Sequence, residues 1–413
     1  MSIVRRIAVC FSLLALLGSW GFRPAVAADP TQLVAGIEQS TQQIRHLKAL
    51  HSVRVKFDND AAFVAALRAN IASNTPEIEI TLGQREDVLL GLLKPTDSLH
   101  NITYSGLTSQ VIGFYDPNTK TLSVRNHLDE ALGPERHVIA HEYTHALQDQ
   151  YYHLNKLMPN LDKVAYRNSD ALGARHALTE GDAVNTELLY IEHNYTAQEI
   201  KAFIKIESRP TPPLPVAMQR DINFPYTTGL DFVTTLYKMR GMASVDAAYH
   251  RLPSSTYEIM HPTAYLNGWK PVAVTLHGIS GFPDWKQMDD DVFGAFGYQV
   301  LLWQFLPKAT ATQVTNLYRG DRYITLENGA QTAIIMKSVW TTHSAAVAAR
   351  SAMLTSLRKR FPHAHTVSGK ATTVTQANGA EYLRVSGTHL TLVYAPTADL
   401  AKQFGTAPAS RGT

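Results

Sequence analysis

The chain is poor in cysteine and in net charge, and both shortages narrow what it can be. Cys10 is the single cysteine among 413 residues, so neither an internal disulfide nor a cysteine-rich zinc module can form. The formal net charge is only +3, which gives no basis for binding nucleic acid. Hydrophobic residues make up 45% of the chain, and this excludes wholesale disorder. Histidine is plentiful, with 17 residues, and points to metal or proton chemistry.

Long apolar runs are scarce too, and the one at the N-terminus predicts a secretory signal. Arg5 and Arg6 precede an apolar run that ends in Pro24-Ala25-Val26-Ala27. The run is shorter than the ~20 residues of a membrane span, although an uncleaved anchor is the alternative. We expect cleavage after Ala27, which gives a secreted or periplasmic protein without a membrane span. Cleavage removes Cys10 and three of the 38 basic residues, leaving 35 basic and 35 acidic residues.

The remaining chain reads as an α+β protein. We expect a mainly helical domain over residues 28–308, whose N-terminal part, residues 28–100, is helical. A small α+β domain is expected over residues 309–413. A hairpin is expected over residues 109–125, where two strand patterns flank the turn signal Asp116-Pro117-Asn118.

Helical patterns follow the hairpin. One helix is expected from Pro134 to Gln150, with proline in its tolerated first turn, and a second over residues 169–194. Further helix is expected around residues 229–240 and 292–305. In the last hundred residues, alternating patterns predict strands over 322–328, 332–340, 381–387 and 388–396, with a helix over 344–361.

The segment His141-Glu142-Tyr143-Thr144-His145 is the informative motif. His-Glu-x-x-His on a helix places two imidazoles one turn apart on the same face, so both can reach one zinc ion. The intervening Glu142 then points to the open coordination position, where it can act as a general base. The chemistry requires this spacing, and the motif lies on a helix that directly follows a hairpin.

The third ligand has to come from elsewhere in the chain. A metzincin would need a histidine at position 151, which is tyrosine here. The downstream segment ALTEGDA resembles the Glu-Gly-x-Ala stretch of gluzincins, whose glutamate before the glycine is a zinc ligand. This resemblance implies Glu180 as the third ligand of one Zn²⁺. Glu187 and Asp182 are competing carboxylates, of which Glu187 lies two helical turns further on, about 10 Å away.

A broader resemblance covers most of residues 85–340. The ordered segments LLGLL, QVIGFYDPNTKTLSVR, HEYTHALQDQ, ALTEGDA, PSSTYEIMHP and RGDRY resemble a group of bacterial secreted zincin-like proteins. Tyr257 departs from that group, where an acidic residue is expected. The resemblance implies a zincin-like fold, but the departure makes any transfer of substrate unsafe.

These residues imply metal-assisted hydrolysis with a general base and a further hydrogen-bond donor. Glu142 would take a proton from water and deliver it to the leaving amine. The tetrahedral oxyanion needs another donor, for which His261 is the first candidate, with Tyr265 and Tyr257 behind it. The alternative for His261 is a hydrogen bond to backbone at a helix end.

Two polar residues near the motif have open roles. His137 lies one turn before His141, and because a fourth protein ligand would close the site, we expect it to pack or to orient a ligand. Asp149, one turn after His145, either orients an imidazole or faces solvent.

The leading hypothesis is a secreted zinc metallopeptidase that acts on a peptide or protein. In zincins, an edge strand above the metal helix binds an extended peptide, and TKTLSVR or SQVIGFY of the hairpin could supply it. The alternative is a hairpin with a structural role only. The alternatives are a non-catalytic zincin-fold binding or scaffold protein of the cell envelope, and a zinc hydrolase of a non-peptide amide or ester. Residues 28–100 could also be a propeptide, although we favour an integral part of the catalytic domain.

Overall fold

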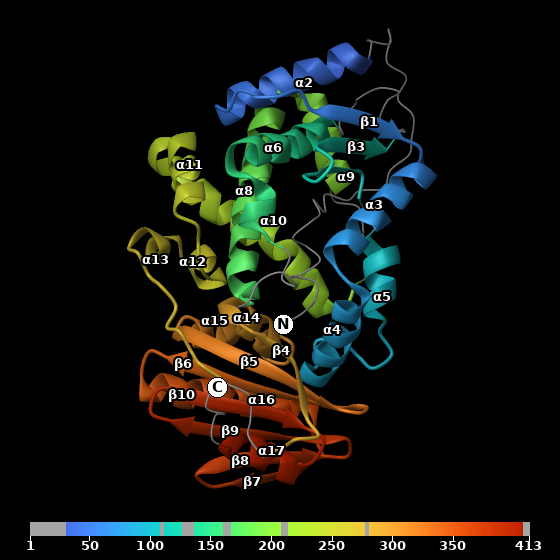
Figure 1. The fold of residues 1–413 in the computed structure, drawn as a ribbon. Helices are drawn as coiled ribbons and strands as arrows, with labels where there is room; N and C mark the ends of the chain where they lie inside the picture. The colour runs from blue at the N-terminus through green and yellow to red at the C-terminus, as the bar shows by residue number, and fades with distance from the viewer. Residues whose placement is uncertain are drawn as a thin grey trace.

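The fold is α+β, as predicted, with long helices stacked on a large sheet (Figure 1). The structure, a computed structural model, describes the chain between residues 30 and 407 except for residues 108–110, 126–135, 160–166, 208–213 and 277–280. The expected signal segment, residues 1–27, lies outside the described residues. None of the described helices is both long and apolar enough to cross a membrane.

Three long helices form the centre of the helical part. They are α6 (Arg136–Tyr152), α8 (Ser169–Asn194) and α10 (Val216–Arg240). The first two agree with the predicted helices, and Asn168 caps the start of α8 by accepting from the Ala171 N–H. The third begins 13 residues earlier than the predicted 229, because Pro225 inside it interrupts the helical pattern that the sequence shows.

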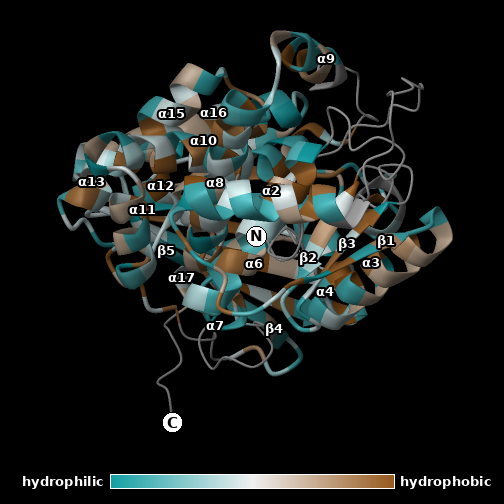
Figure 2. Ribbon diagram, turned by 90° about the horizontal axis from the view of Figure 1, so that it is seen from above, coloured by the Kyte–Doolittle hydropathy of each residue, from teal (hydrophilic) through white to brown (hydrophobic). Residues whose placement is uncertain are grey.

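The first helix, α2 (Pro30–Arg45), lies across α6 and α8 at the top of the molecule (Figures 1 and 2). Its apolar residues Val34 and Ile37 are buried in a cluster with Ile139 and Tyr143 of α6. The expected helical N-terminal part is therefore packed onto the helix that carries the His-Glu-x-x-His motif.

A three-stranded sheet covers one side of α6. Its strands are β1 (Arg54–Asp58), β2 (Gly113–Asp116) and β3 (Thr121–Arg125), in the order β1-β3-β2. The hairpin predicted around Asp116 is confirmed as the antiparallel pair β2–β3, while β1 runs parallel to β3. Strand β2 is therefore an edge strand of this sheet, and it contacts α6.

A seven-stranded sheet forms the base of the molecule, in the order β4-β5-β6-β10-β9-β8-β7 (Figure 1). The predicted strands correspond to β5, β6, β9 and β10, whereas β4, β7 and β8 were not predicted. The strands are β4 (Lys286–Asp291), β5 (Tyr318–Asn328), β6 (Gln331–Trp340), β7 (His365–Ser368), β8 (Ala371–Gln376), β9 (Gly379–Ser386) and β10 (His389–Ala395). Its neighbouring helices are α14 (Gly294–Trp303), α15 (Lys308–Thr315), α16 (His343–Arg360) and α17 (Ala398–Thr406).

Shorter helices complete the described structure. They are α3 (Asp60–Asn74), α4 (Glu77–Leu90), α5 (Leu99–Asn101), a π-helical turn (Ile102–Leu107), α7 (Leu154–Leu157), α9 (Ala197–Glu207), α11 (Met242–His250), α12 (Thr256–Met260) and α13 (Pro262–Leu266).

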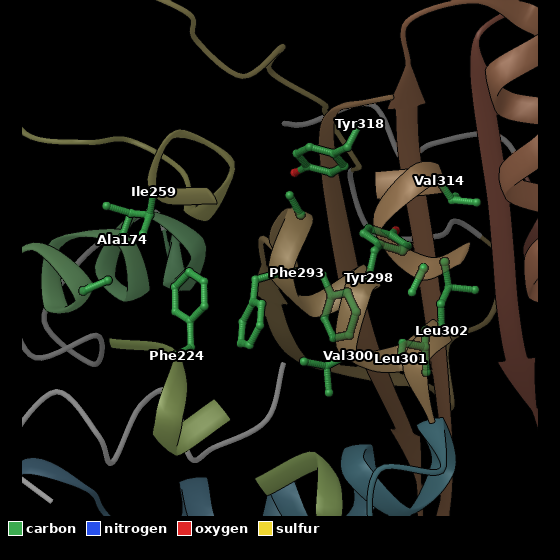
Figure 3. Packing of buried hydrophobic residues seen from close by; sticks show 14 of the residues in the cluster. Ala174, Phe224, Ile259, Phe293, Tyr298, Val300, Leu301, Leu302, Val314 and Tyr318 are labelled. Carbon is green, nitrogen blue, oxygen red and sulfur yellow. The ribbon is translucent and has the colours of Figure 1, made fainter. Parts of the chain in front are cut away.

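The largest hydrophobic cluster runs from the helices into the large sheet. Figure 3 shows Phe224 of α10 next to Phe293, and Tyr298 with Tyr318 of β5 beyond them. The rings of Phe224 and Phe296 stack with centroids 3.9 Å apart. The cluster therefore contains residues from both sides of the boundary expected at 308/309.

Candidate metal centre

His141, His145 and Glu180 meet in the interior of the helical part. Both histidines lie on α6 and the glutamate on α8, and all three are buried. The two Nε2 atoms are 3.2 Å apart, and Glu180 Oε2 lies 3.3 Å from His141 Nε2 and 3.4 Å from His145 Nε2. The spacing of four residues puts the imidazoles on one face of α6, as expected.

The amide of Gln148 fixes the orientation of His145. Its Nε2 donates to Thr179 O at 3.0 Å and to Asp182 Oδ2 at 2.9 Å, so the amide oxygen must face the imidazole. That oxygen lies 2.8 Å from His145 Nδ1. Since an amide oxygen only accepts, Nδ1 carries the proton, and Nε2 presents its lone pair to the cluster.

The carboxylate of Glu187 performs the same task for His141. One oxygen lies 2.9 Å from His141 Nδ1 and the other 2.6 Å from His137 Nδ1. Two imidazole N–H groups thus donate to one buried carboxylate, and His141 also presents Nε2 to the cluster. His137 accordingly lies beside Glu187 and is not one of the three clustered ligands. These contacts hold the pKa of Glu187 down to about 2: burial raises it, but the hydrogen bonds from His137 and His141 lower it more.

His176 holds the third ligand. Its Nε2 lies 3.2 Å from Glu180 Oε1, one helical turn away on α8. This bond uses one carboxylate oxygen and turns the other, Oε2, toward the two histidines. His176 was not among the predicted site residues, although its spacing of four residues from Glu180 was the available signal.

The donor set fits a cation. With a proton on each Nδ1, two imidazole lone pairs and a carboxylate oxygen face one another across 3.2–3.4 Å, which is repulsive unless positive charge sits among them. A proton on Nε2 can also supply this charge: burial lowers the pKa of His141, but its hydrogen bonds to Glu180 and Glu187 outweigh this and raise it to about 10. For the carboxylate of Glu180 the directions are reversed. Burial raises its pKa, but His145 and His141 outweigh this and hold it well below its usual range.

Glu142 lies beside this cluster on α6, and the edge strand holds it. The Tyr115 N–H donates to Glu142 Oε2 at 2.8 Å. Strand and helix approach closely at Gly113, where a Cβ would lie 3.1 Å from Val138 and 3.5 Å from Glu142 Cγ. The buried carboxylate is thereby positioned by the hairpin that precedes the metal helix.

Asp182 and Asp149 have structural roles that the sequence left open. Asp182 is buried and accepts from Gln148, from Arg45 and from the Tyr249 hydroxyl. Asp149 is also buried, and it accepts from Tyr115 Oη at 2.9 Å and Lys120 Nζ at 2.5 Å. Asp149 therefore ties the hairpin to α6.

The proposed oxyanion residues lie together around α12 and α13. His261 stands between these helices, and its ring packs 4.3 Å from that of Tyr257. The hydroxyl of Tyr257 donates to Asn316 O and that of Tyr265 to Arg251 O. Among the described residues, His261 is not one of the groups gathered at the three ligands.

A different tyrosine lies at the cluster. Tyr226 of α10 is partly exposed, and its ring lies 6.4 Å from the ring of His141. No local pattern marked it, because it reaches the site only through the crossing of α10 with α8. Gln148 was also missed, although it stands three residues after His145 and thus on the same helix face.

Comparison with known proteins identifies only part of the chain. Residues 282–404 match a family described as a domain of unknown function (DUF8575). This match begins ahead of residue 309 and includes β4 and α14, and β4 pairs with β5 in the large sheet. No curated protein and no solved structure matches the chain. The metal cluster lies outside the matched segment.

Proposed function

We propose that the protein is a secreted zinc metallopeptidase of zincin-like, gluzincin type. The observation that carries this proposal is Glu142, a buried carboxylate next to three metal-binding side chains and fixed by the Tyr115 N–H. A metal site that only stabilises a fold is usually closed by four protein ligands and has no use for an adjacent base. Three ligands with a neighbouring carboxylate are typical of catalytic zinc.

The donor types favour zinc as the metal. Two imidazoles and one carboxylate oxygen form a set that catalytic zinc sites use, whereas Mg²⁺ and Ca²⁺ prefer oxygen ligands throughout. His141, His145 and Glu180 would hold the ion. When bound, zinc supplies Lewis-acid chemistry, because it lowers the pKa of water and polarises a carbonyl.

The protein's own groups move the proton. Glu142 accepts a proton from the water as its oxygen attacks the scissile carbonyl carbon. As the C–N bond breaks, Glu142 returns this proton to the leaving nitrogen, so the carboxylate is regenerated. The Tyr115 N–H keeps the carboxylate in place during both transfers.

The hydroxyl of Tyr226 is the better placed candidate for stabilising the oxyanion. Its ring centroid lies 6.4 Å from that of the ligand His141, whereas Tyr257 and Tyr265 lie on α12 and α13. A phenol that donates to the developing oxyanion stabilises the transition state more than the ground state. His261 stays a second candidate for this role.

We propose that β2 is the peptide-binding strand and that the peptide pairs with its outer edge. Among the strands that the structure describes, β2 pairs with β3 alone, so we propose that its other edge accepts an added strand. The Tyr115 N–H points to Glu142 and hence away from β3, so this edge adjoins the base. A peptide added here would lie beside the metal cluster, which supports peptides as substrates.

The Glu142→Gln variant tests the proposal. We expect it to keep one zinc ion per chain and to lose about 10²–10⁴-fold in peptide hydrolysis, because an amide cannot take the proton. Metal analysis and turnover of a peptide library measure both properties. Glu192→Gln, an exposed change on α8, is the matched control and should retain full activity.

Three results would contradict the proposal. Full activity in Glu142→Gln would exclude this residue as the base. Zinc-loaded wild-type protein that cleaves only non-peptide amides or esters would identify the alternative hydrolase. Zinc binding without any hydrolysis would instead identify a binding or scaffold protein of the cell envelope.

A further inference from the structure

We propose that Arg45 is a positioning residue of the metal centre, and that α2 is a permanent part of that centre. Arg45 reaches the ligand His145 through a chain of two side chains, Asp182 and Gln148. The inference rests on the metal site proposed above, and it concerns a part of the chain that no motif connects to the site.

The first link is a buried ion pair. Arg45 ends α2, and its side chain is fully buried. Its Nε lies 2.8 Å from Asp182 Oδ1 and donates to Oδ2 at 3.1 Å, while Nη2 lies 2.7 Å from Asp246. A guanidinium shielded from solvent is tolerated only where carboxylates face it. The pair of Arg45 with Asp182 therefore fixes α2 relative to α8 at this point.

The second link is the direction of the Gln148 amide. Asp182 Oδ2, which Arg45 holds, accepts from Gln148 Nε2 at 2.9 Å, and Thr179 O accepts from the same nitrogen. Both acceptors turn the amide NH₂ away from His145. A flipped amide would place NH₂ against His145 Nδ1 and force that imidazole to carry its proton on Nε2, the atom that faces the metal position.

Arg45 therefore acts on the metal through the tautomer and orientation of one ligand. Side chains that orient ligand histidines typically change metal affinity 10–100-fold when removed. The position of Arg45 also bears on processing: if α2 were removed as a propeptide, Asp182 would lose its cation. We therefore infer that mature, metal-loaded protein retains residues 30–45.

Zinc affinity of the full mature chain tests the inference. Wild type, Arg45→Lys and Arg45→Met are compared by competition with a chromophoric chelator, using zinc alone as the probe. We expect Arg45→Met to bind zinc about 10–100-fold more weakly and Arg45→Lys to recover part of the loss. Arg125→Met is the matched control, because Arg125 is a buried arginine paired with Asp60, outside the Asp182–Gln148 chain, and it should keep wild-type affinity.

A double-mutant cycle separates positioning from general stability. Gln148→Met removes the second link, so adding Arg45→Lys to it should cause no further loss of zinc affinity. Additive losses, or wild-type affinity in both Arg45 variants, would overturn the inference. If Arg45→Met does not fold, Arg45→Lys and the cycle still decide. Failure of wild-type protein to bind zinc would instead refute the metal site itself.

Discussion

Single side chains outside the ligand set decide which nitrogen of each histidine faces the cluster. Gln148 accepts a hydrogen bond from the Nδ1–H of His145, and Glu187 accepts one from that of His141. His176 is hydrogen-bonded to one oxygen of Glu180. The three ligands thus present lone pairs to one point before any metal arrives. Such preorganisation lowers the cost of metal binding, since the ligands need not reorient.

The large sheet contains a buried carboxyl group, that of Glu381, whose surroundings raise its pKa. Glu381 of β9 accepts from Gln376 Nε2 at 3.0 Å through Oε1, while its buried Oε2 has no hydrogen-bond partner among the described residues. Burial raises the pKa of Glu381 to about 7, although Arg360 and Gln376 act in the opposite direction. The carboxylate is therefore protonated in the folded state at a pH where it is ionised in the unfolded chain.

This shift predicts a pH-dependent stability that Glu381→Gln removes. Because the pKa is raised on folding, the contribution of Glu381 to the free energy of unfolding is fully present below its unfolded value of about 4.5 and is lost as the pH rises through about 7. A shift of this size corresponds to about 3 kcal/mol at most. Denaturant unfolding at pH 5 and pH 8 measures it: the variant should gain on wild type at pH 8 only. The same difference in free energy of unfolding between variant and wild type at pH 5 and pH 8 would contradict the prediction. Glu192→Gln serves as an exposed control.

At the scale of elements, the site depends on how closely α8 and α10 cross. A Cβ on Gly181 would lie 2.3 Å from the backbone carbonyl of Gly229, and a Cβ on Gly229 would lie 2.2 Å from Ala177 O. Only glycine allows the two backbones to approach this far. The glycine of the Glu-Gly-x-Ala stretch therefore sets the position of α10 next to the ligand Glu180.

Gly181→Ala should consequently destabilise the fold and disturb the metal site. The added methyl group has to push backbone away from backbone, and overpacking of this kind costs about 1–3 kcal/mol or more. Thermal unfolding and zinc affinity measure the two effects. Gly36→Ala on α2 is the matched control: its Cβ would meet nothing within 4 Å, so that variant should gain about 0.5–1 kcal/mol. Equal stability of the two variants would show that the crossing is not tight.

The elements that carry the motif could be predicted from the sequence, because their patterns are local. The helix over 169–194 and the β2–β3 hairpin have strong periodicity and caps or turns within a few residues. Strand β4, with the sequence KQMDDD, could not be predicted, because acidic residues disfavour strands. Its aspartates are satisfied by distant partners: Asp289 accepts from Tyr323 Oη, and Asp291 from Ser169.

The candidate site likewise contains residues that local patterns predict and residues that they do not. Local spacing was enough for His141, Glu142 and His145, and a short resemblance for Glu180. Arg45 and Tyr226 could not be predicted, because they reach the cluster through helix packing, which leaves no periodic signal in one sequence.

On the scale of the whole molecule, the large sheet supports the helix that carries Glu180. The Ser169 N–H at the start of α8 donates to Asp291 Oδ1 of β4 at 2.8 Å, and the Ser169 hydroxyl donates to the other oxygen. Next to it, Asp170 Oδ1 accepts from the Thr256 N–H at 3.0 Å. The start of α8 is therefore bonded to the edge of the sheet, within the segment that matches DUF8575.

The helices before the metal motif are bonded to the same sheet. Glu86 of α4 accepts from Thr325 Oγ1 of β5 at 2.6 Å, and Arg360 of α16 donates to the carbonyls of Val88 and Leu89 at 2.9 Å. The bonds from Arg360 supply donors to carbonyls in the last turn of α4, of which Val88 O also accepts from the Gly91 N–H at 3.1 Å. The end of α4 is thus anchored on residues after 308, whereas the start of α8 is bonded to residues before it.

A chain that ends at residue 308 should therefore fail to fold, although the sequence suggested a domain boundary there. It would keep β4 without its partner β5, expose Phe293 and Tyr298, and leave Glu86 without the Thr325 hydroxyl. We expect a truncated protein of residues 28–308 to show no cooperative thermal transition and no stoichiometric zinc binding, whereas residues 28–413 show both. Calorimetry and metal analysis of the two proteins test this. Cooperative melting with wild-type zinc affinity in the shorter chain would show that the helical part is an independent domain, and that the bonds from Thr325 and Arg360 only dock the sheet onto it.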